Sequence, residues 1–148
     1  MEIDKYIKGY KENYERVLEE LEQGYKIGHW MWFIFPQLKG LGKSNFSDYY
    51  GLNGIGDAKE FYRNRFLRRR MSRLFRTVNS FGSSFHLRQF FGETDSKKFH
   101  SCATIFYIAT GDRSFKKPID KFFNGELDEN TMSILMSKGE LGNGVHTL

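Results

Sequence analysis

Residues 28–44, GHWMWFIFPQLKGLGKS, decide how the fold of this chain is interpreted. The first half of this segment holds two tryptophans, two phenylalanines, a histidine and a proline, and the second half holds two close glycines and a serine. Pro36 is incompatible with the interior of a regular helix. We therefore expect an irregular, buried aromatic segment over residues 29–38, followed by a turn at Gly40 and Gly42.

The same segment is compatible with two roles, the centre of the core or the wall of a pocket. Aromatic rings bury large areas, and they also stack on flat rings such as a nucleobase or a nicotinamide. Trp30 and Trp32 are the rings that would do so here. His29 could then act as an acid or a base, and Gln37 could hydrogen-bond the edge of the bound ring.

The glycine turn that follows has the ingredients of an anion site. Backbone N–H groups, a lysine and a helix N-terminus can together hold a phosphate. The residues that would supply them are Gly40, Gly42, Lys43 and Ser44. Their spacing is not that of a P-loop, so the phosphate site is one interpretation and a plain structural turn is the other.

Helical periodicity covers most of the remaining chain. We expect helices over residues 4–23, 44–50, 58–63, 65–79, 83–91, 94–110, 114–124 and 128–136. No stretch alternates convincingly as a strand would. The fold class is therefore mostly α, with seven to eight short and medium helices in a single compact domain over residues 1–138. Residues 139–148 have little to bury and are expected to form a mobile C-terminal tail.

Composition restricts the class of protein. The chain has 148 residues, 17% of them aromatic, and a formal net charge of +5. Cys102 is the single cysteine, so no internal disulfide can form. No signal peptide or membrane span is expected, which favours a cytoplasmic protein. The four histidines show no metal-ligand spacing, and we expect neither a metal nor a cofactor.

An excess of positive charge is concentrated in one predicted helix. At helical spacing its exposed band consists of Arg65, Arg69, Arg73 and Arg76. Only Asp57 and Glu60 lie near it in the sequence, so salt bridges do not balance the band. An anionic partner, including nucleic acid, is one interpretation, and a solvated helix face is the other. No aromatic residues alternate with the arginines, so stacking on single-stranded bases is not favoured.

The predicted helix over residues 94–110 carries a polar face opposite its apolar stripe. Lys97 and Ser101 align on this face and could meet the 29–44 segment. His100 points about 100° away from Ser101 on a helix, so this helix alone does not form a Ser–His pair. Cys102 lies on the apolar stripe, where a buried thiol is normally inert.

Four stretches resemble a small family of uncharacterised bacterial and fungal proteins. They are HWMWFIFPQLKGLGKS (29–44), GLNGIGDAKEFYRNRFLRRRMSRL (51–74), ETDSKKFHSCATIF (93–106) and KPIDKFFNGELDENTMSIL (117–135). Members of this family carry a domain of unknown function and are often mislabelled as calpastatins. The resemblance implies one compact all-helical domain over about residues 4–137 and supplies no reaction. Cys102 stands where a serine is common in the family, which argues against a required nucleophile.

Two function hypotheses follow. The first is a nucleotide-handling enzyme, a hydrolase or N-glycosidase acting on a ligand of the NAD or ADP-ribose type. Its catalytic candidates are His29, Asp48 and Asp95, and its ligand-binding candidates are Trp30, Trp32, Gln37, Gly40, Gly42, Lys43, Ser44, Lys97 and Ser101. The second is a non-catalytic module that docks an anionic partner through the arginine band. The enzyme requires His29, Gln37, Ser44 and Lys97 to converge on one cleft.

Overall fold

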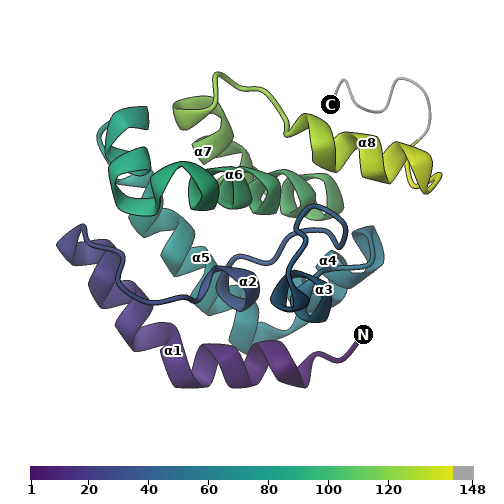
Figure 1. Cartoon of the computed structure of the whole chain (residues 1–148), viewed down its shortest axis with the longest axis horizontal. Helices are drawn as coiled ribbons and strands as arrows, with labels where there is room; N and C mark the ends of the chain where they lie inside the picture. The colour runs from purple at the N-terminus through teal and green to yellow at the C-terminus, as the bar shows by residue number, and fades with distance from the viewer. Residues whose placement is uncertain (142–148) are drawn as a thin grey trace.

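Eight α-helices form in residues 1–141, the part of the chain that this computed structural model describes (Figure 1). They are α1 (Asp4–Gln23), α2 (Met31–Ile34), α3 (Asn45–Tyr50), α4 (Ile55–Arg63), α5 (Arg65–Asn79), α6 (Ser84–Thr110), α7 (Arg113–Phe122) and α8 (Glu129–Ser137). These residues contain no strand, only one isolated parallel bridge between Leu38 and Leu52. The expected all-α fold is confirmed.

Polar side chains start most of these helices. Ser44, Asn64, Ser83 and Asp128 each accept a hydrogen bond from a backbone N–H in the first turn of the helix that follows, which satisfies a donor that the helix leaves free. The same role at α7 belongs to Asp112, two residues before the expected Ser114. Helix α4 also begins earlier than expected, at Ile55.

Helix α6 consists of two helical parts that meet at a kink at Gly92. Its φ of 78° and ψ of 175° are not helical, and only glycine adopts this conformation readily. Two helices, separated at Gly92, were expected here from the sequence. The structure joins them end to end across the kink, so that α6 runs through the middle of the molecule (Figure 1).

The expected irregular segment 29–38 contains one regular turn, α2. Tyr10 Oη donates a hydrogen bond to the Ile34 carbonyl at 2.7 Å and holds this turn against α1. Pro36 lies just beyond the turn, where its missing N–H is harmless. Backbone bonds from Lys39 N to Leu52 O, at 2.8 Å, and from Leu52 N to Gln37 O, at 2.9 Å, then fix the chain beside the α3–α4 connection.

The core is built from rings. Phe35 is buried, and its ring meets those of Phe75, Phe91 and Phe99 nearly edge-on, with centroids 5.3–6.1 Å apart. This arrangement is favoured over face-to-face contact. Cys102 is fully buried among these elements, and burial raises the pKa of its thiol. The expectation that Cys102 packs rather than reacts agrees with this position.

Trp30 belongs to the core, which corrects its assignment to a pocket wall. Its side chain is 0% exposed, and its Nε1–H donates to Glu20 Oε1 at 3.0 Å. The same carboxylate oxygen accepts from Ile27 N at 2.8 Å and Gly28 N at 3.2 Å. Glu20 therefore ties the α1–α2 connection to the ring, and no ligand can reach Trp30.

The segment that follows α8 packs against the rest of the domain as far as Leu141. Glu140 Oε1 accepts a hydrogen bond from Ile55 N at 2.9 Å, at the start of α4. Leu141 is buried. The expected mobile tail therefore does not begin at residue 139, and residues 142–148 lie outside the described residues. Within residues 1–141, no helix combines the length and the apolar character that a membrane span requires.

Candidate functional site

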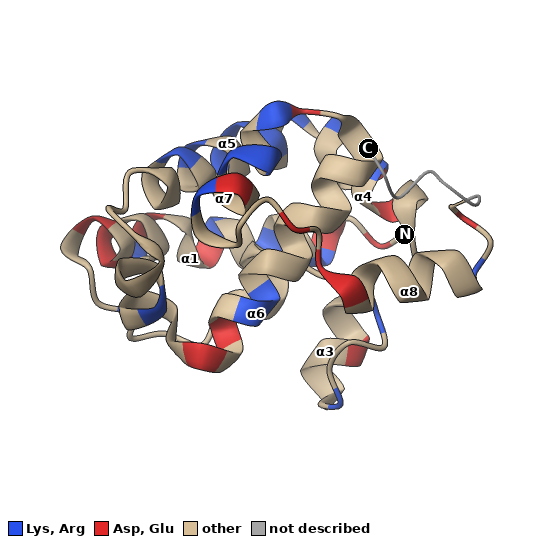
Figure 2. Ribbon diagram, turned by 90° about the horizontal axis from the view of Figure 1, so that it is seen from above, with Lys and Arg blue, Asp and Glu red and all other residues tan. Residues whose placement is uncertain are grey.

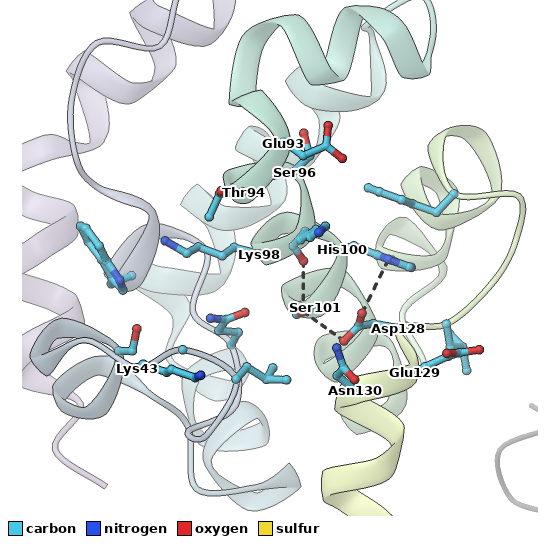
Figure 3. A pocket seen from close by; sticks show the side chains of 18 of the residues that line it. Lys43, Glu93, Thr94, Ser96, Lys98, His100, Ser101, Asp128, Glu129 and Asn130 are labelled. Atoms are coloured by element: carbon cyan, nitrogen blue, oxygen red, sulfur yellow. Dashed lines mark hydrogen bonds and ion pairs between the residues drawn. The ribbon is translucent and has the colours of Figure 1, made fainter.

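A pocket of about 790 Å³ lies between the glycine turn, the middle of α6 and the start of α8 (Figure 3). Seven of the residues expected from the sequence to bind a ligand line it together. They are Trp32, Gln37, Gly42, Lys43, Ser44, Lys97 and Ser101. The polar face of α6 therefore meets the segment around residues 37–44, as its spacing predicted.

The three catalytic candidates lie outside this pocket. His29 is exposed in the α1–α2 connection, and Asp48 is exposed on α3. Asp95 pairs with Lys26 at 3.0 Å and Lys98 at 3.4 Å, so its carboxylate is neutralised. His29 therefore does not join Gln37, Ser44 and Lys97 in one cleft, because it lies at an exposed position of the α1–α2 connection.

Gly40 is also outside the lining. Its φ of 100° belongs to the left-handed region, which glycine tolerates best. A Cβ at this position would face Ile134 of α8, 3.8 Å away. Gly40 therefore shapes the turn, and Gly42, Lys43 and Ser44 are the turn residues that reach the pocket.

One wall of the pocket is a hydrogen-bonded network at the start of α8. Asp128 Oδ2 accepts bonds from Ser101 Oγ at 3.1 Å, Thr131 N at 3.0 Å and Thr131 Oγ1 at 2.6 Å. Asp128 N in turn donates to Thr104 Oγ1 at 3.0 Å. Asp128 therefore joins α8 to α6, and its Oδ2 has no capacity left for a ligand (Figure 3).

His100 is held in place beside this network. Its ring stacks on Phe123 with centroids 4.0 Å apart, and its Nε2 lies 2.6 Å from the Glu126 carbonyl oxygen. Because a carbonyl only accepts, Nε2 carries the proton. Nδ1 lies 3.9 Å from Asp128 Oδ1. Ser101 donates to Asp128 and to the Lys97 carbonyl, so the structure pairs no serine with His100, as its position on the helix predicted.

Two buried donors in the lining have no hydrogen-bond partner. They are Trp32 Nε1–H and the hydroxyl of Ser96, a residue only 3% exposed. The Trp32 ring lies beside Phe46, with centroids 5.1 Å apart, and Lys98 Nζ lies 4.7 Å from its centre. A buried donor without an acceptor is unfavourable, so either group would gain a hydrogen bond if a small movement of the lining opened it to an acceptor on a ligand.

Charges of opposite sign occupy different sides of the pocket. Lys43 and Lys98 lie across it from Asp128 and Asn130 (Figure 3). The remaining charged lining residues are Arg88, Glu93, Lys97, Glu126 and Glu129. Lys43 and Lys97 form no ion pair with the described residues. Such a pocket can hold an anion on one side and hydroxyl or cationic groups on the other.

The sequence did not predict that the α7–α8 connection contributes to the pocket. Asp128 was recognised as the cap of α8, and His100 as a polar residue of α6. Their meeting with Glu126 and Phe123 depends on contacts between residues 23–28 positions apart, which periodicity does not reveal. The Asp128 cap next to an exposed Glu129–Asn130 pair was the one available signal.

The arginine band lies away from the pocket. Figure 2 shows basic residues along α5 and on the adjacent α7. Arg65, Arg69, Arg73 and Arg76 are exposed, and none forms an ion pair with the described residues. Arg68 and Arg70 instead turn back and donate to the carbonyls of Tyr62 and Phe66. The predicted band is therefore present on α5.

No group of three or more His, Cys, Asp or Glu side chains in residues 1–141 is arranged to hold a metal ion.

Comparison with known proteins places the chain among relatives of undetermined function. The family model described as "Protein of unknown function (DUF1810)" matches residues 1–135. The crystal structure of the conserved hypothetical protein Rv1873 from Mycobacterium tuberculosis is similar, with 33% sequence identity and a TM-score of 0.85 over 90% of this chain and 96% of that one. No curated protein matches.

Proposed function

The chain belongs to the DUF1810 family, and because the family's function is unknown, we propose one from the chemistry of the pocket: it binds a small nucleotide-type ligand of the NAD or ADP-ribose class. The observation that carries this proposal is that one pocket is lined by two lysines without ion pairs among the described residues, Lys43 and Lys97, and by two donors that lack acceptors, Trp32 Nε1–H and Ser96 Oγ–H. Each unsatisfied donor costs about 1–3 kcal/mol, and a ligand acceptor would recover this energy.

The two sides of the pocket fit the two kinds of group in such a ligand. The ammonium groups of Lys43 and Lys97 suit phosphate oxygens. The carboxylates of Glu126 and Glu129 suit ribose hydroxyls, which donate, and the positive charge of an oxidised nicotinamide ring. A volume of about 790 Å³ lies within the usual range for small-molecule sites.

A reaction at the glycosidic bond would require a carboxylate near the sugar, because positive charge develops there in the transition state. Asp128 is unsuited, since its Oδ2 already accepts three hydrogen bonds. Glu126 and Glu129 line the pocket and are exposed. We therefore assign the carboxylate role in the hydrolase or N-glycosidase hypothesis to Glu126 or Glu129, in place of Asp48 and Asp95.

Thermal denaturation with NAD, ADP-ribose and mononucleotides tests binding. A ligand at a hundred times its Kd stabilises by about 2.7 kcal/mol, and the double variant Lys43→Ala with Lys97→Ala should lose this shift. Arg69→Ala with Arg73→Ala is the matched control, because it also removes two positive charges but leaves the pocket intact. The absence of any shift, or an equal loss in both variants, would overturn the proposal.

Incubation with NAD or ADP-ribose, followed by chromatography of the products, tests catalysis separately. Release of nicotinamide or ribose phosphate that is lost in Glu126→Gln or in Glu129→Gln would establish an enzyme. Binding without turnover in the wild type would leave a binding protein and remove the enzymatic hypothesis.

A second candidate function is the docking of an anionic partner through the arginine band. The observation that favours it is the exposure of four guanidinium groups that have no carboxylate partner in residues 1–141. Loss of polyanion binding in Arg69→Ala with Arg73→Ala, together with retained nucleotide binding, would assign the two functions to two surfaces.

A further inference from the structure

We infer that the partner of the arginine band is double-stranded nucleic acid, held through its phosphate backbone. This inference rests on the second candidate function above. It depends on three features of the surface: its extension onto a second helix, the linear spacing of its charges and its lack of exposed apolar groups.

The basic surface extends from α5 onto α7. Arg76 and Lys117 line the same hollow, which has a volume of about 570 Å³. Lys121 Nζ donates to the Asn79 carbonyl at 2.8 Å, so this ammonium group lies against the end of α5. We call the combined set the α5–α7 basic surface; it consists of Arg65, Arg69, Arg73, Arg76, Lys117 and Lys121 (Figure 2).

Carboxylates are scarce on this surface. Asp112 accepts hydrogen bonds from Tyr62 Oη, at 2.6 Å, and Ser114 N, at 2.9 Å. Asp120 is paired with Lys116. Asp112 lines the same hollow as Arg76 and Lys117 and keeps its charge, but no carboxylate in residues 1–141 pairs with the four arginines, so the surface remains strongly positive.

The arginines form a row rather than a cluster. Spacings of four, four and three residues keep them on one face of α5, and the row is about 16 Å long at 1.5 Å per residue. A compact ligand such as a single phosphate would meet only one or two of these groups. A duplex carries one charge per ~1.7 Å of its axis, so it can engage the whole row.

A membrane surface fits less well. Helices that bind membranes insert apolar side chains between the lipids, whereas the large exposed hydrophobic residues all lie outside α5 and α7. They are Met1, Tyr25, Ile27, Phe46, Tyr49, Phe85 and Met136. The same absence disfavours an acidic protein, because protein interfaces usually centre on aromatic or aliphatic anchors.

Single-stranded nucleic acid also fits less well, because its bases require exposed rings on which to stack. Phe66, the only half-exposed ring of α5, is covered by Arg70, whose guanidinium carbon lies 3.7 Å from the ring centre. Both phenylalanines of α7, Phe115 and Phe122, are buried. The surface can therefore contact a duplex backbone but cannot read unpaired bases.

Fluorescence anisotropy over a salt series tests the inference. The probes are a short labelled DNA duplex, an RNA duplex of the same sequence, either single strand, heparin and vesicles containing phosphatidylserine. The variant is Arg69→Ala with Arg73→Ala. The matched control is Lys39→Ala with Lys138→Ala, which removes two exposed lysines near α3 and α8.

We expect both duplexes to bind with little sequence dependence and more tightly than the single strands. The arginine variant should bind about tenfold more weakly, and its slope of log K against log salt should be smaller by about 2. The control should match the wild type. Circular dichroism establishes that both variants are folded.

The contrary outcomes are distinguishable. If heparin binds but duplexes bind no better than single strands, or if the vesicles bind and the duplexes do not, the inference is wrong while an anion-docking function stands. If none of the polyanions binds, both the inference and that function fail. Nucleotide binding in the pocket is unaffected by either result.

Discussion

At the scale of single residues, the path of the α1–α2 connection depends on one buried carboxylate, that of Glu20. Burial opposes its ionisation, but hydrogen bonds from Ile27 N, the Trp30 indole and Gly28 N, helped by Arg16, outweigh burial and lower the pKa of the carboxyl. The folded state therefore favours the carboxylate more than the unfolded chain does, and Glu20 stabilises the fold only while it is ionised.

Glu20→Gln should lower the free energy of unfolding at neutral pH by about 1–3 kcal/mol, because an amide accepts these bonds less strongly and brings donors of its own. Since the pKa is depressed on folding, the contribution of Glu20 is complete above the unfolded value, near 4.5, and is lost as the pH falls through the folded value. Urea denaturation at neutral and acidic pH checks this. The difference between wild type and variant should shrink in acid, and a constant difference would contradict the assignment.

Unlike Glu20→Gln, a substitution of Ser96 should not destabilise the free protein. Its buried hydroxyl has no partner, so Ser96→Ala should raise the unfolding free energy of the free protein by about 1–3 kcal/mol, yet weaken the binding of ADP-ribose measured by calorimetry. Ser101→Ala is the comparison, because it removes hydrogen bonds to Asp128 and Lys97 and should cost about 1 kcal/mol. If Ser96→Ala left the affinity unchanged, Ser96 would have no role in binding.

Trp30 and Trp32 show where prediction from sequence stops at this scale. Both are aromatic, two positions apart, and both were assigned to a pocket wall. Trp30 is directed inward because a carboxylate ten residues earlier accepts its N–H, whereas Trp32 Nε1 has no acceptor and its residue lines the pocket. The difference depends on a tertiary contact, which neither the residue type nor the sequence spacing predicts.

Helix α3 and the turn before it are the element on which the anion side of the pocket depends. Ser44 Oγ caps α3 by accepting from Ser47 N at 3.1 Å. A Cβ at Gly42 would come within 2.8 Å of Ser47 Cβ, closer than two carbons approach without displacement. Gly42 is therefore required because Ser47 packs too close to it for a Cβ, and not because its φ is unusual.

Gly42→Ala should displace Ser47, loosen the cap of α3 and weaken nucleotide binding while leaving the core intact. Hydrogen exchange followed by mass spectrometry should show faster exchange over residues 42–50 and unchanged exchange over α6. Gly56→Ala is the control, since a Cβ there meets nothing within 4 Å. Equal effects of the two variants would contradict the close-approach argument.

Helices were the most predictable elements, because their signals are local. Gly24 and Gly111 end α1 and α6 with left-handed φ values, close to the helix ends expected from the sequence, and Asn64 both ends α4 and caps α5. The start of α4 was placed three residues too late because Gly54 caps it through its backbone and the carboxylate that accepts from Ile55 N belongs to Glu140. A cap supplied from 85 positions away leaves no local signal.

At the scale of the whole molecule, the pocket and the α5–α7 basic surface are separate. The pocket lies between α3, α6 and α8, whereas α5 and α7 form another edge (Figure 2). The sequence predicted the domain, its class and seven residues of the pocket. It could not predict which loops close the pocket, because the α7–α8 connection and the glycine turn are brought together only by folding.

Residues 139–141 should contribute to global stability. A chain ending at Lys138 loses the Glu140 bond to Ile55 N and the buried Leu141 side chain, which together should lower the unfolding free energy by about 2–4 kcal/mol. A chain ending at Leu141 is the control, because it keeps both contacts and should be more stable than the chain ending at Lys138 by this amount. Thermal and urea denaturation of the three lengths measures this, and equal midpoints would contradict it.

The attachment of α8 at both ends has a consequence for kinetics. Asp128 fastens its start to α6, and Glu140 with Leu141 fastens the segment after it near α4. The start of α8 forms one side of the pocket, so release of either fastening would let this wall move away from a bound ligand. A bound ligand would then lose its contacts with this wall whenever the C-terminal fastening opens, and the chain ending at Lys138 would shorten residence time more than it weakens initial capture.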